Sequence, residues 1–325
     1  MPGKYLFHKI SVVLTPLIIT MFLFSVAYAA SREDIIADSL NDIEEGKTSD
    51  TFRQKLKKVI TEETPAEETP WEVDAYVKYM PTSGVHNQSG KVGLTDVESQ
   101  YSYEFKVAEK IPVKLAYTNK YISIDNTTAV KLPAHLTGMV FDVETTLPFF
   151  NVENTYFRLG VSPSFYTDNW SAYSSAFRMP SRYMMIHRSN EQFTWVLGVA
   201  AFPDYETPVL PIAGFIYKPN DKLTFNIIPS EPTIEYDIND KLGIFAEMGI
   251  IGGEYEVTKD DMNGLKLEYD DNYLGGGVNY SPTKNINASL SVGGSFNRLL
   301  QYRDSFGKVS LKNNFYTKLR VEMSF

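Results

Sequence analysis

His187 and Ser189 are the residues of this chain whose types and spacing come nearest to hydrolytic chemistry. A serine hydrolase needs a nucleophile, a base within hydrogen-bond reach, a group that orients the base, and an oxyanion donor. In a strand, positions 187 and 189 would share a face as neighbours, and the sequence shows no third group beside them. We therefore interpret them as surface or turn residues. We expect no enzyme and no catalytic residues, with a lipid hydrolase as the least favoured alternative.

Metal or cofactor chemistry has no clear motif either. The chain has no cysteine, and its histidines after the amino terminus are isolated, so no zinc spacing exists. Five acids gather near one expected hairpin and could hold Ca²⁺ or share divalent ions with lipopolysaccharide, although a solvated loop is the simpler interpretation. They are Asp260, Asp261, Glu268, Asp270 and Asp271. We predict no metal site and no cofactor.

The amino terminus predicts export from the cytoplasm. Lys4, His8 and Lys9 precede an apolar run from Ile10 to Val26, and the small residues at 27–29 suit a cleavage site, so residues 1–29 are expected to be a signal peptide. An uncleaved membrane anchor is the alternative. The formal net charge of −9 argues against a nucleic-acid partner, which would need a basic surface.

Residues 30–70 differ in composition from the rest of the chain. They are acidic, they end in a proline-punctuated linker, and two short stretches have helical apolar spacing, Ile36–Ile43 and Phe52–Ile60. We predict a partly helical periplasmic segment. We favour a partly ordered tail, because short isolated helices are marginal in water. The alternatives are a periplasmic interaction element and an element that enters and plugs the barrel described next.

From Trp71 to Phe325 the chain alternates between apolar and polar residues over segments of about ten residues, the length that a tilted strand needs to cross a membrane. The last segment, 315–325, has apolar side chains on one face, and an aromatic residue ends the chain. A bacterial outer-membrane barrel closes with such a strand, and we expect the barrel-assembly machinery to recognise it. The candidate assembly-signal residues are Leu319, Val321, Met323 and Phe325.

The opposite faces of these strands carry charges that would point into the barrel. In a lumen, mixed charges either line a selective pore or pair with one another across neighbouring strands, and pairing is the simpler expectation. The candidate lumen-lining residues are Glu98, Glu104, Lys106, Asp142, Glu144, Arg158, Lys318, Arg320 and Glu322.

Turn residues indicate the topology. Tight turns are expected at 109–112, 218–221, 239–240 and 281–284, and longer loops at 169–181 and 259–264. With Phe325 in the periplasm, strict alternation requires a strand near Arg182–Arg188 and a short strand on each side of Pro229 to Pro232. We predict an all-β, antiparallel, up-and-down transmembrane barrel of about fourteen strands, or about twelve if the short pair does not span. A soluble lipocalin-like barrel is the weaker alternative.

Part of the barrel resembles a family of bacterial outer-membrane β-barrel proteins of unknown function. The similarity lies in the run from Pro211 to Asp221, with its Tyr217-Lys-Pro-Asn-Asp221 turn, and in the strands that follow, through Gly249-Ile-Ile-Gly-Gly-Glu-Tyr255. It covers about a third of the barrel. The resemblance implies the fold and the location, but it implies no activity and no functional residues.

Together these patterns predict an outer-membrane barrel with both termini in the periplasm, surrounded by lipid and lipopolysaccharide. We expect a passive pore or a structural barrel, with a small solute as the possible ligand of a pore. The alternative is a transporter of a hydrophobic or lipid ligand.

Overall fold

The computed structural model describes residues 71–325 except for 108–110, 150–151, 171–173, 204–207, 230, 259–263 and 304–305. The described residues belong to one compact unit. The predicted signal peptide and acidic segment lie outside them. The described helix is a single 3-10 turn, η1 (Ser174–Ala176), and none in this part of the chain is long and apolar enough to cross a membrane.

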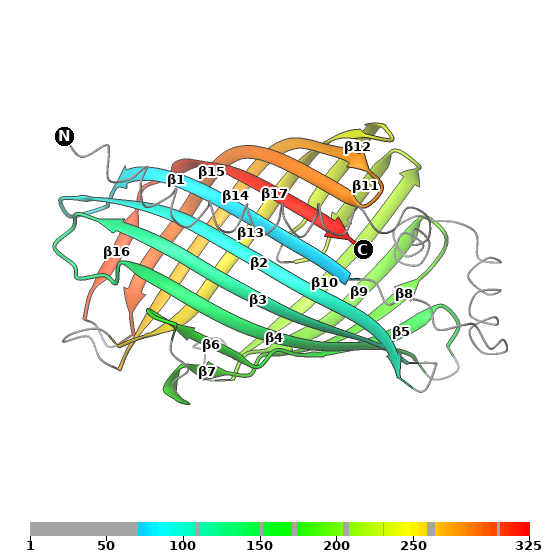
Figure 1. The fold of residues 1–325 in the computed structure, drawn as a ribbon, viewed down its shortest axis with the longest axis horizontal. Helices are drawn as coiled ribbons and strands as arrows, with labels where there is room; N and C mark the ends of the chain where they lie inside the picture. Colours follow the sequence, from blue (N-terminus) through cyan, green and yellow to red (C-terminus); the bar gives the residue numbers. More distant parts are fainter. Residues whose placement is uncertain are drawn as a thin grey trace. The chain divides into compact units, whose positions relative to one another are not determined.

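Seventeen strands form one sheet within the described residues (Figure 1). They are β1 (Trp71–Gly84), β2 (Lys91–Val107), β3 (Ile111–Asn126), β4 (His135–Pro148), β5 (Thr155–Val161), β6 (Ser164–Thr167), β7 (Phe177–Arg178), β8 (Ser181–Arg188), β9 (Phe193–Ala201), β10 (Val209–Asn220), β11 (Leu223–Ile227), β12 (Thr233–Asn239), β13 (Leu242–Val257), β14 (Leu265–Thr283), β15 (Ile286–Tyr302), β16 (Lys308–Leu311) and β17 (Asn314–Ser324).

The sheet closes on itself, because β1 pairs with both β2 and β17, antiparallel in each case (Figure 1). At three positions in the wall, two consecutive strands follow one another along the same line and together act as one strand. These pairs are β5 with β6, β7 with β8, and β16 with β17. Seventeen strands less three gives fourteen wall positions. The prediction of an antiparallel barrel of about fourteen strands is therefore confirmed, including β8 at 181–188 and the short pair β11 and β12.

Connections at the two ends of the barrel differ in length. The end that carries Trp71 and Phe325, here called the terminal end, has two-residue connections at 221–222, 240–241 and 284–285. The opposite end, here called the loop end, carries the longer connections 127–134, 168–176 and 258–264. Asparagine shapes two of the tight turns, since the side chains of Asn220 and Asn239 accept hydrogen bonds from backbone amides two residues on. The predicted turn at 281–284 is displaced to 284–285, because β14 continues to Thr283.

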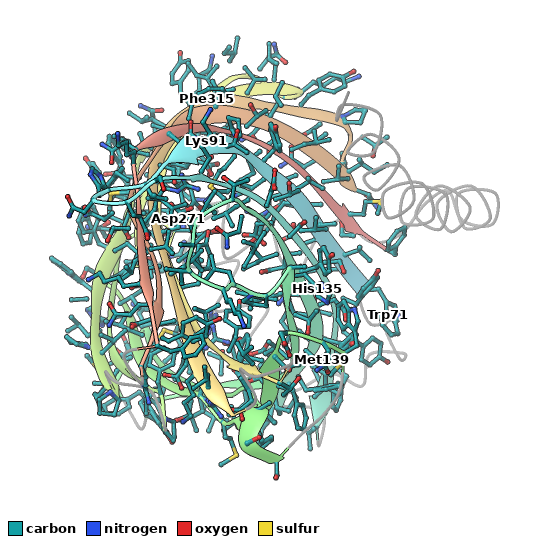
Figure 2. All side chains as sticks on the ribbon, turned by 90° about the vertical axis from the view of Figure 1, so that its left-hand side faces the viewer. Trp71, Lys91, His135, Met139, Asp271 and Phe315 are labelled. Atoms are coloured by element: carbon teal, nitrogen blue, oxygen red, sulfur yellow. The ribbon has the colours of Figure 1, made fainter. Side chains whose placement is uncertain are left out.

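Near the terminal end, the outward face of the wall is apolar. Register pairs Val77 with Val97 and Leu319, and Val73 with Tyr101 and Met323, so these side chains share one face. Many of them are half exposed, including Trp71, Leu197 and Val292. Figure 2 shows Trp71 and Phe315 outside the ring of strands, whereas Asp271 lies inside it. This polarity, apolar outside and charged inside, is that of a membrane barrel and the reverse of a lipocalin.

Towards the loop end the barrel narrows. Strand β6 leaves the line of its neighbours and makes a parallel pair with β13, Thr167 with Glu256, and the amide of Asp168 donates to the Glu256 carbonyl oxygen over 3.1 Å. An isolated bridge, Val85 with Leu311, joins the end of β1 to β16. At this level the described strands form a closed ring of nine: β1, β2, β3, β4, β6, β13, β14, β15 and β16.

The interior of the nine-strand ring is filled. Inward-facing apolar side chains from eight of these strands and from β17 form one cluster, and each is at most 7% exposed. Interiors of barrels with about eight strands are just wide enough for side chains to fill, so nine strands explain the packing. We call this cluster the plug: Met80, Val85, Val92, Leu94, Ile122, Ile124, Leu136, Tyr255, Val257, Leu267, Tyr269, Tyr273, Leu300, Tyr302, Val309, Leu311 and Tyr316.

Candidate functional site: the charged lumen below the plug

Near the terminal end, the inner wall carries ion pairs between neighbouring strands. Glu72 on β1 lies 2.5 Å from Lys114 Nζ on β3, and Glu98 on β2 lies 2.7 Å from Lys120 Nζ. Arg320 on β17 donates two hydrogen bonds to the carboxylate of Asp74, of 2.8 and 2.6 Å. These side chains are about one-fifth to one-third exposed, so water reaches them. The wide part of the lumen therefore has a hydrated, paired lining.

Further from the terminal end, a buried network of side chains surrounds Glu247 of β13. Its carboxylate lies 3.3 Å from Lys318 Nζ and accepts hydrogen bonds from Tyr316 at 2.9 Å and Ser291 at 2.5 Å. Lys318 is also 3.4 Å from the hydroxyl of Tyr273. Glu247 and Lys318 are less than 10% exposed. Because both charges have several polar partners, their burial is compensated.

Glycines make room for the aromatic rings of this network. A Cβ on Gly275 would lie 2.1 Å from the Tyr316 hydroxyl, and one on Gly249 would lie 2.1 Å from the Tyr273 ring. Tyr316 also covers Gly293, where a Cβ would be 2.7 Å from the ring. Close packing in the lumen therefore requires glycine at these positions.

The base of the plug holds a fully buried ion cluster. Asp271 lies 2.7 Å from Lys78 Nζ and 3.7 Å from Arg298 Nε, and all three side chains are at most 1% exposed. A bulge in β15 at Asn297, whose φ is 50°, turns Arg298 inward. Lys78 also lies 4.1 Å above the ring of Tyr273. At this level the charges of the inner wall are therefore buried, in contrast to the partly exposed pairs near the terminal end.

Most of the predicted lumen residues lie on this inner wall and are paired. Besides Glu98, Lys318 and Arg320, the structure brings Glu144 within 3.5 Å of Arg158, Asp142 within 3.3 Å of Arg182, and Glu322 within 3.0 Å of Arg320. Glu104 is half-buried opposite Lys114 in register, and Lys106 is exposed at the terminal end. That these charges line the lumen of an open pore remains a prediction.

The predicted assembly-signal residues occupy the outward face of β17. Leu319 is 52% exposed, and Val321 and Met323 follow on the same face. Phe325 closes the ladder with β1, since it exchanges backbone hydrogen bonds of 2.8 and 3.2 Å with Trp71. Recognition by the assembly machinery stays a prediction.

The weaker candidates separate in space. His187 Nδ1 lies 2.9 Å from the Thr155 hydroxyl on the outward side of β8, whereas Ser189 lies in the following turn. Of the five acids near 260–271, Asp260 and Asp261 lie outside the described residues. Among the other three, Asp271 points into the plug, whereas Glu268 and Asp270 lie on the opposite face of β14, so these three do not form one cluster. Within the described part of the chain, no group of three or more His, Cys, Asp or Glu residues could hold a metal ion.

Several residues of the buried network were not predicted, namely Lys78, Glu247, Arg298, Tyr316 and Tyr76, whose ring centre lies 5.1 Å from Lys318 Nζ. The alternation of Glu72, Asp74, Tyr76 and Lys78 in β1 was the available signal for two of them. Arg298 had none, since its direction depends on the bulge.

A family model described as "Domain of unknown function (DUF6268)" matches residues 73–325, which is nearly the whole described barrel. The chain belongs to this family. The predicted resemblance to an uncharacterised family of barrel proteins is thereby confirmed, and the DUF6268 match extends it from a third of the barrel to all of it.

Solved structures with a similar fold include outer-membrane channels and porins. An outer membrane channel from Pseudomonas putida F1 is 10% identical, with a TM-score of 0.45, covering 81% of this chain and 100% of that one. A mutant of the monoaromatic hydrocarbon channel TodX is 8% identical, with a TM-score of 0.37, covering 82% of this chain and 93% of that one. The NanC porin is 10% identical, with a TM-score of 0.36, covering 77% of this chain and 98% of that one. No curated protein matches the sequence significantly. At these identities and TM-scores, the likenesses say nothing about what this DUF6268 barrel carries.

Proposed function

We propose that this DUF6268 protein is an outer-membrane barrel that transports small apolar molecules and is not a wide water-filled pore. Its half-exposed apolar outer face suits a lipid layer, and its terminal end, with the short turns, would face the periplasm. Lipopolysaccharide would surround the loop end. The closing strand would be the part that the assembly machinery recognises.

The observation that carries this proposal is the plug. Fourteen strands can enclose a channel, but the nine-strand ring is filled with apolar side chains from around its circumference, above the buried Asp271 cluster. A hydrated ion or sugar would lose its water there with nothing to replace it, at a cost of several kcal/mol. An uncharged apolar molecule has no such cost.

A passive pore or a purely structural barrel is the second candidate. The charged, partly exposed lining near the terminal end favours it, because such a surface suits water and ions. In that case the plug would have to move aside in the membrane.

Two measurements separate the candidates. In planar bilayers we expect no stable conductance steps from folded, purified protein. In a Gram-negative host with intact lipopolysaccharide, expression should speed entry of the uncharged probe N-phenyl-1-naphthylamine several-fold, while entry of a hydrophilic β-lactam, followed by its periplasmic hydrolysis, stays unchanged. Conductance steps together with faster β-lactam entry would establish the pore. No effect on either solute would leave a structural barrel.

A further inference from the structure

The wall has a shoulder where fourteen strand positions become nine. Strand β10 pairs with β9 along Val209–Tyr217, but with β11 only from Phe215 towards the terminal end. Strand β13 pairs with β14 up to Val257, but with β12 only up to Glu247. Within the described residues, no strand pairs with β10 along 209–214 or with β13 along 248–254 on these edges. Arg178 of β7 lies 3.3 Å from the Glu254 carboxylate and bounds this interval towards the loop end. The short hairpin of β11 and β12, at the upper right in Figure 1, ends on the terminal-end side of this interval.

The shoulder is apolar on both sides of the wall. On the rim, Val209 is 55% exposed, Leu210 46% and Ile250 62%. Below it, the inner face of the adjoining strands β9 and β10 is also apolar, since register places Val196, Ala200 and Ile212 on the inward face. The charged residues of that face, Arg158 and Arg182, lie further along the wall on β5 and β8. Exposed apolar side chains at a rim suit contact with lipid rather than with water. The shoulder thus joins an apolar strip of the lumen to the apolar belt outside.

A contact across the lumen holds the hairpin that borders the shoulder. Glu231, in the turn between β11 and β12, accepts a hydrogen bond of 3.0 Å from Tyr273 and lies 3.7 Å from Lys318 Nζ and 4.0 Å from Arg320. Next to this turn, the amide of Met248 donates to the Pro232 carbonyl oxygen at 3.0 Å. Glu231 is 47% exposed, so its ion pairs are weak and reversible.

Charge around this contact limits what can pass. The two cations, Lys318 and Arg320, are within 4.0 Å of four carboxylates, those of Glu231, Glu247, Asp74 and Glu322. An anionic molecule would meet this excess of negative charge, whereas an uncharged one would not.

We propose that the shoulder is a lateral passage between the wide lumen and the lipid layer for uncharged apolar molecules, and that Glu231 latches the β11–β12 turn beside it. The inference rests on the proposed transport function. It explains how a barrel with a filled loop end moves a ligand, because the passage bypasses the plug. The chain has no cysteine, so single thiols test the route without background labelling.

The first test compares Leu210→Cys on the rim with Leu197→Cys, which is equally exposed at 46% but lies on the outward face of β9. Both variants are reacted with a bulky maleimide and assayed for N-phenyl-1-naphthylamine entry. We expect the label at 210 to reduce the entry rate at least five-fold, and the label at 197 to leave it unchanged. Equal effects of the two labels would overturn the lateral route.

The second test compares Glu231→Gln with Glu235→Gln, since Glu235 is on the same hairpin but its carboxylate accepts a hydrogen bond from Thr233 instead. Release of the latch should raise the entry rate two- to five-fold in Glu231→Gln and leave it unchanged in Glu235→Gln. Heat-modifiable migration on gels shows that each variant folds. If wild type transports the probe and Glu231→Gln matches it, the latch is wrong while the proposed function stands; if wild type shows no transport, the proposed function itself fails.

Discussion

Replacement of Asp271 by Asn tests whether the buried ion cluster holds the narrow end of the barrel together. The substitution keeps the size of the side chain but leaves Lys78 and Arg298 without the carboxylate that they share, in a place where all three side chains are at most 1% exposed. Removing one partner from a buried ion pair costs roughly 3–5 kcal/mol, because an uncompensated charge stays buried. We expect that loss in the free energy of unfolding.

The assay is urea unfolding of the refolded barrel in detergent micelles, followed by tryptophan fluorescence and by migration on gels. With a slope of about 2 kcal/mol per molar urea, the midpoint should fall by about 1.5–2.5 M. The matched control is Glu72→Gln, which breaks a Lys–carboxylate pair of similar length, 2.5 Å, whose side chains are about one-third exposed. That pair should contribute less than about 1 kcal/mol. If both variants lost the same stability, or if Asp271→Asn lost less, burial of the cluster would not be what makes it important.

Three further outcomes follow from the packing and from the closing strand. Gly275→Ala should lower the unfolding free energy by about 1–3 kcal/mol in the same assay, because the new Cβ meets the Tyr316 hydroxyl at 2.1 Å and the Val292 carbonyl oxygen at 2.6 Å; Gly294→Ala, which has open space around its Cβ, should be nearly neutral. Deleting Phe325 should lower the amount of folded barrel in the outer-membrane fraction several-fold, whereas Phe315→Ala, at the other end of the same face, should not; equal yields would argue against a terminal assembly signal. Val292→Arg, on the outward face and 59% exposed, should cost about 2–4 kcal/mol in lipid vesicles, and no loss would argue against a lipid-facing position.

The fourteen-strand wall was predictable because local sequence patterns determine its strands and turns. Each strand alternates with a period of two, the turns use Asn, Asp and Pro, and the phase of β17 carries over to its neighbours through register. The pairs Glu144 with Arg158 and Glu322 with Arg320 follow from the same alternation.

The narrow ring was not predictable from these patterns. It depends on one pair of residues far apart in sequence, Thr167 and Glu256, in a parallel arrangement that has no local signature. Nor does the alternation show that the inward residues turn apolar towards the loop end as part of a plug, since Val92 and Leu94 continue the face that carries Glu98. The contacts of Glu231 with Lys318 and Arg320 cross the lumen from a turn, and no spacing rule links them.

The direct contact between β6 and β13 also bears on how this family can vary. The strands from β7 to β12, residues 177–239, together form an insertion between β6 and β13, which are neighbours in the narrow ring. We call this segment the excursion. The residues that fill the ring come from outside that excursion. Hairpins could therefore be gained or lost there two strands at a time, which would widen or shrink the terminal end without repacking the plug. We expect relatives that differ in strand number to differ between these two strands.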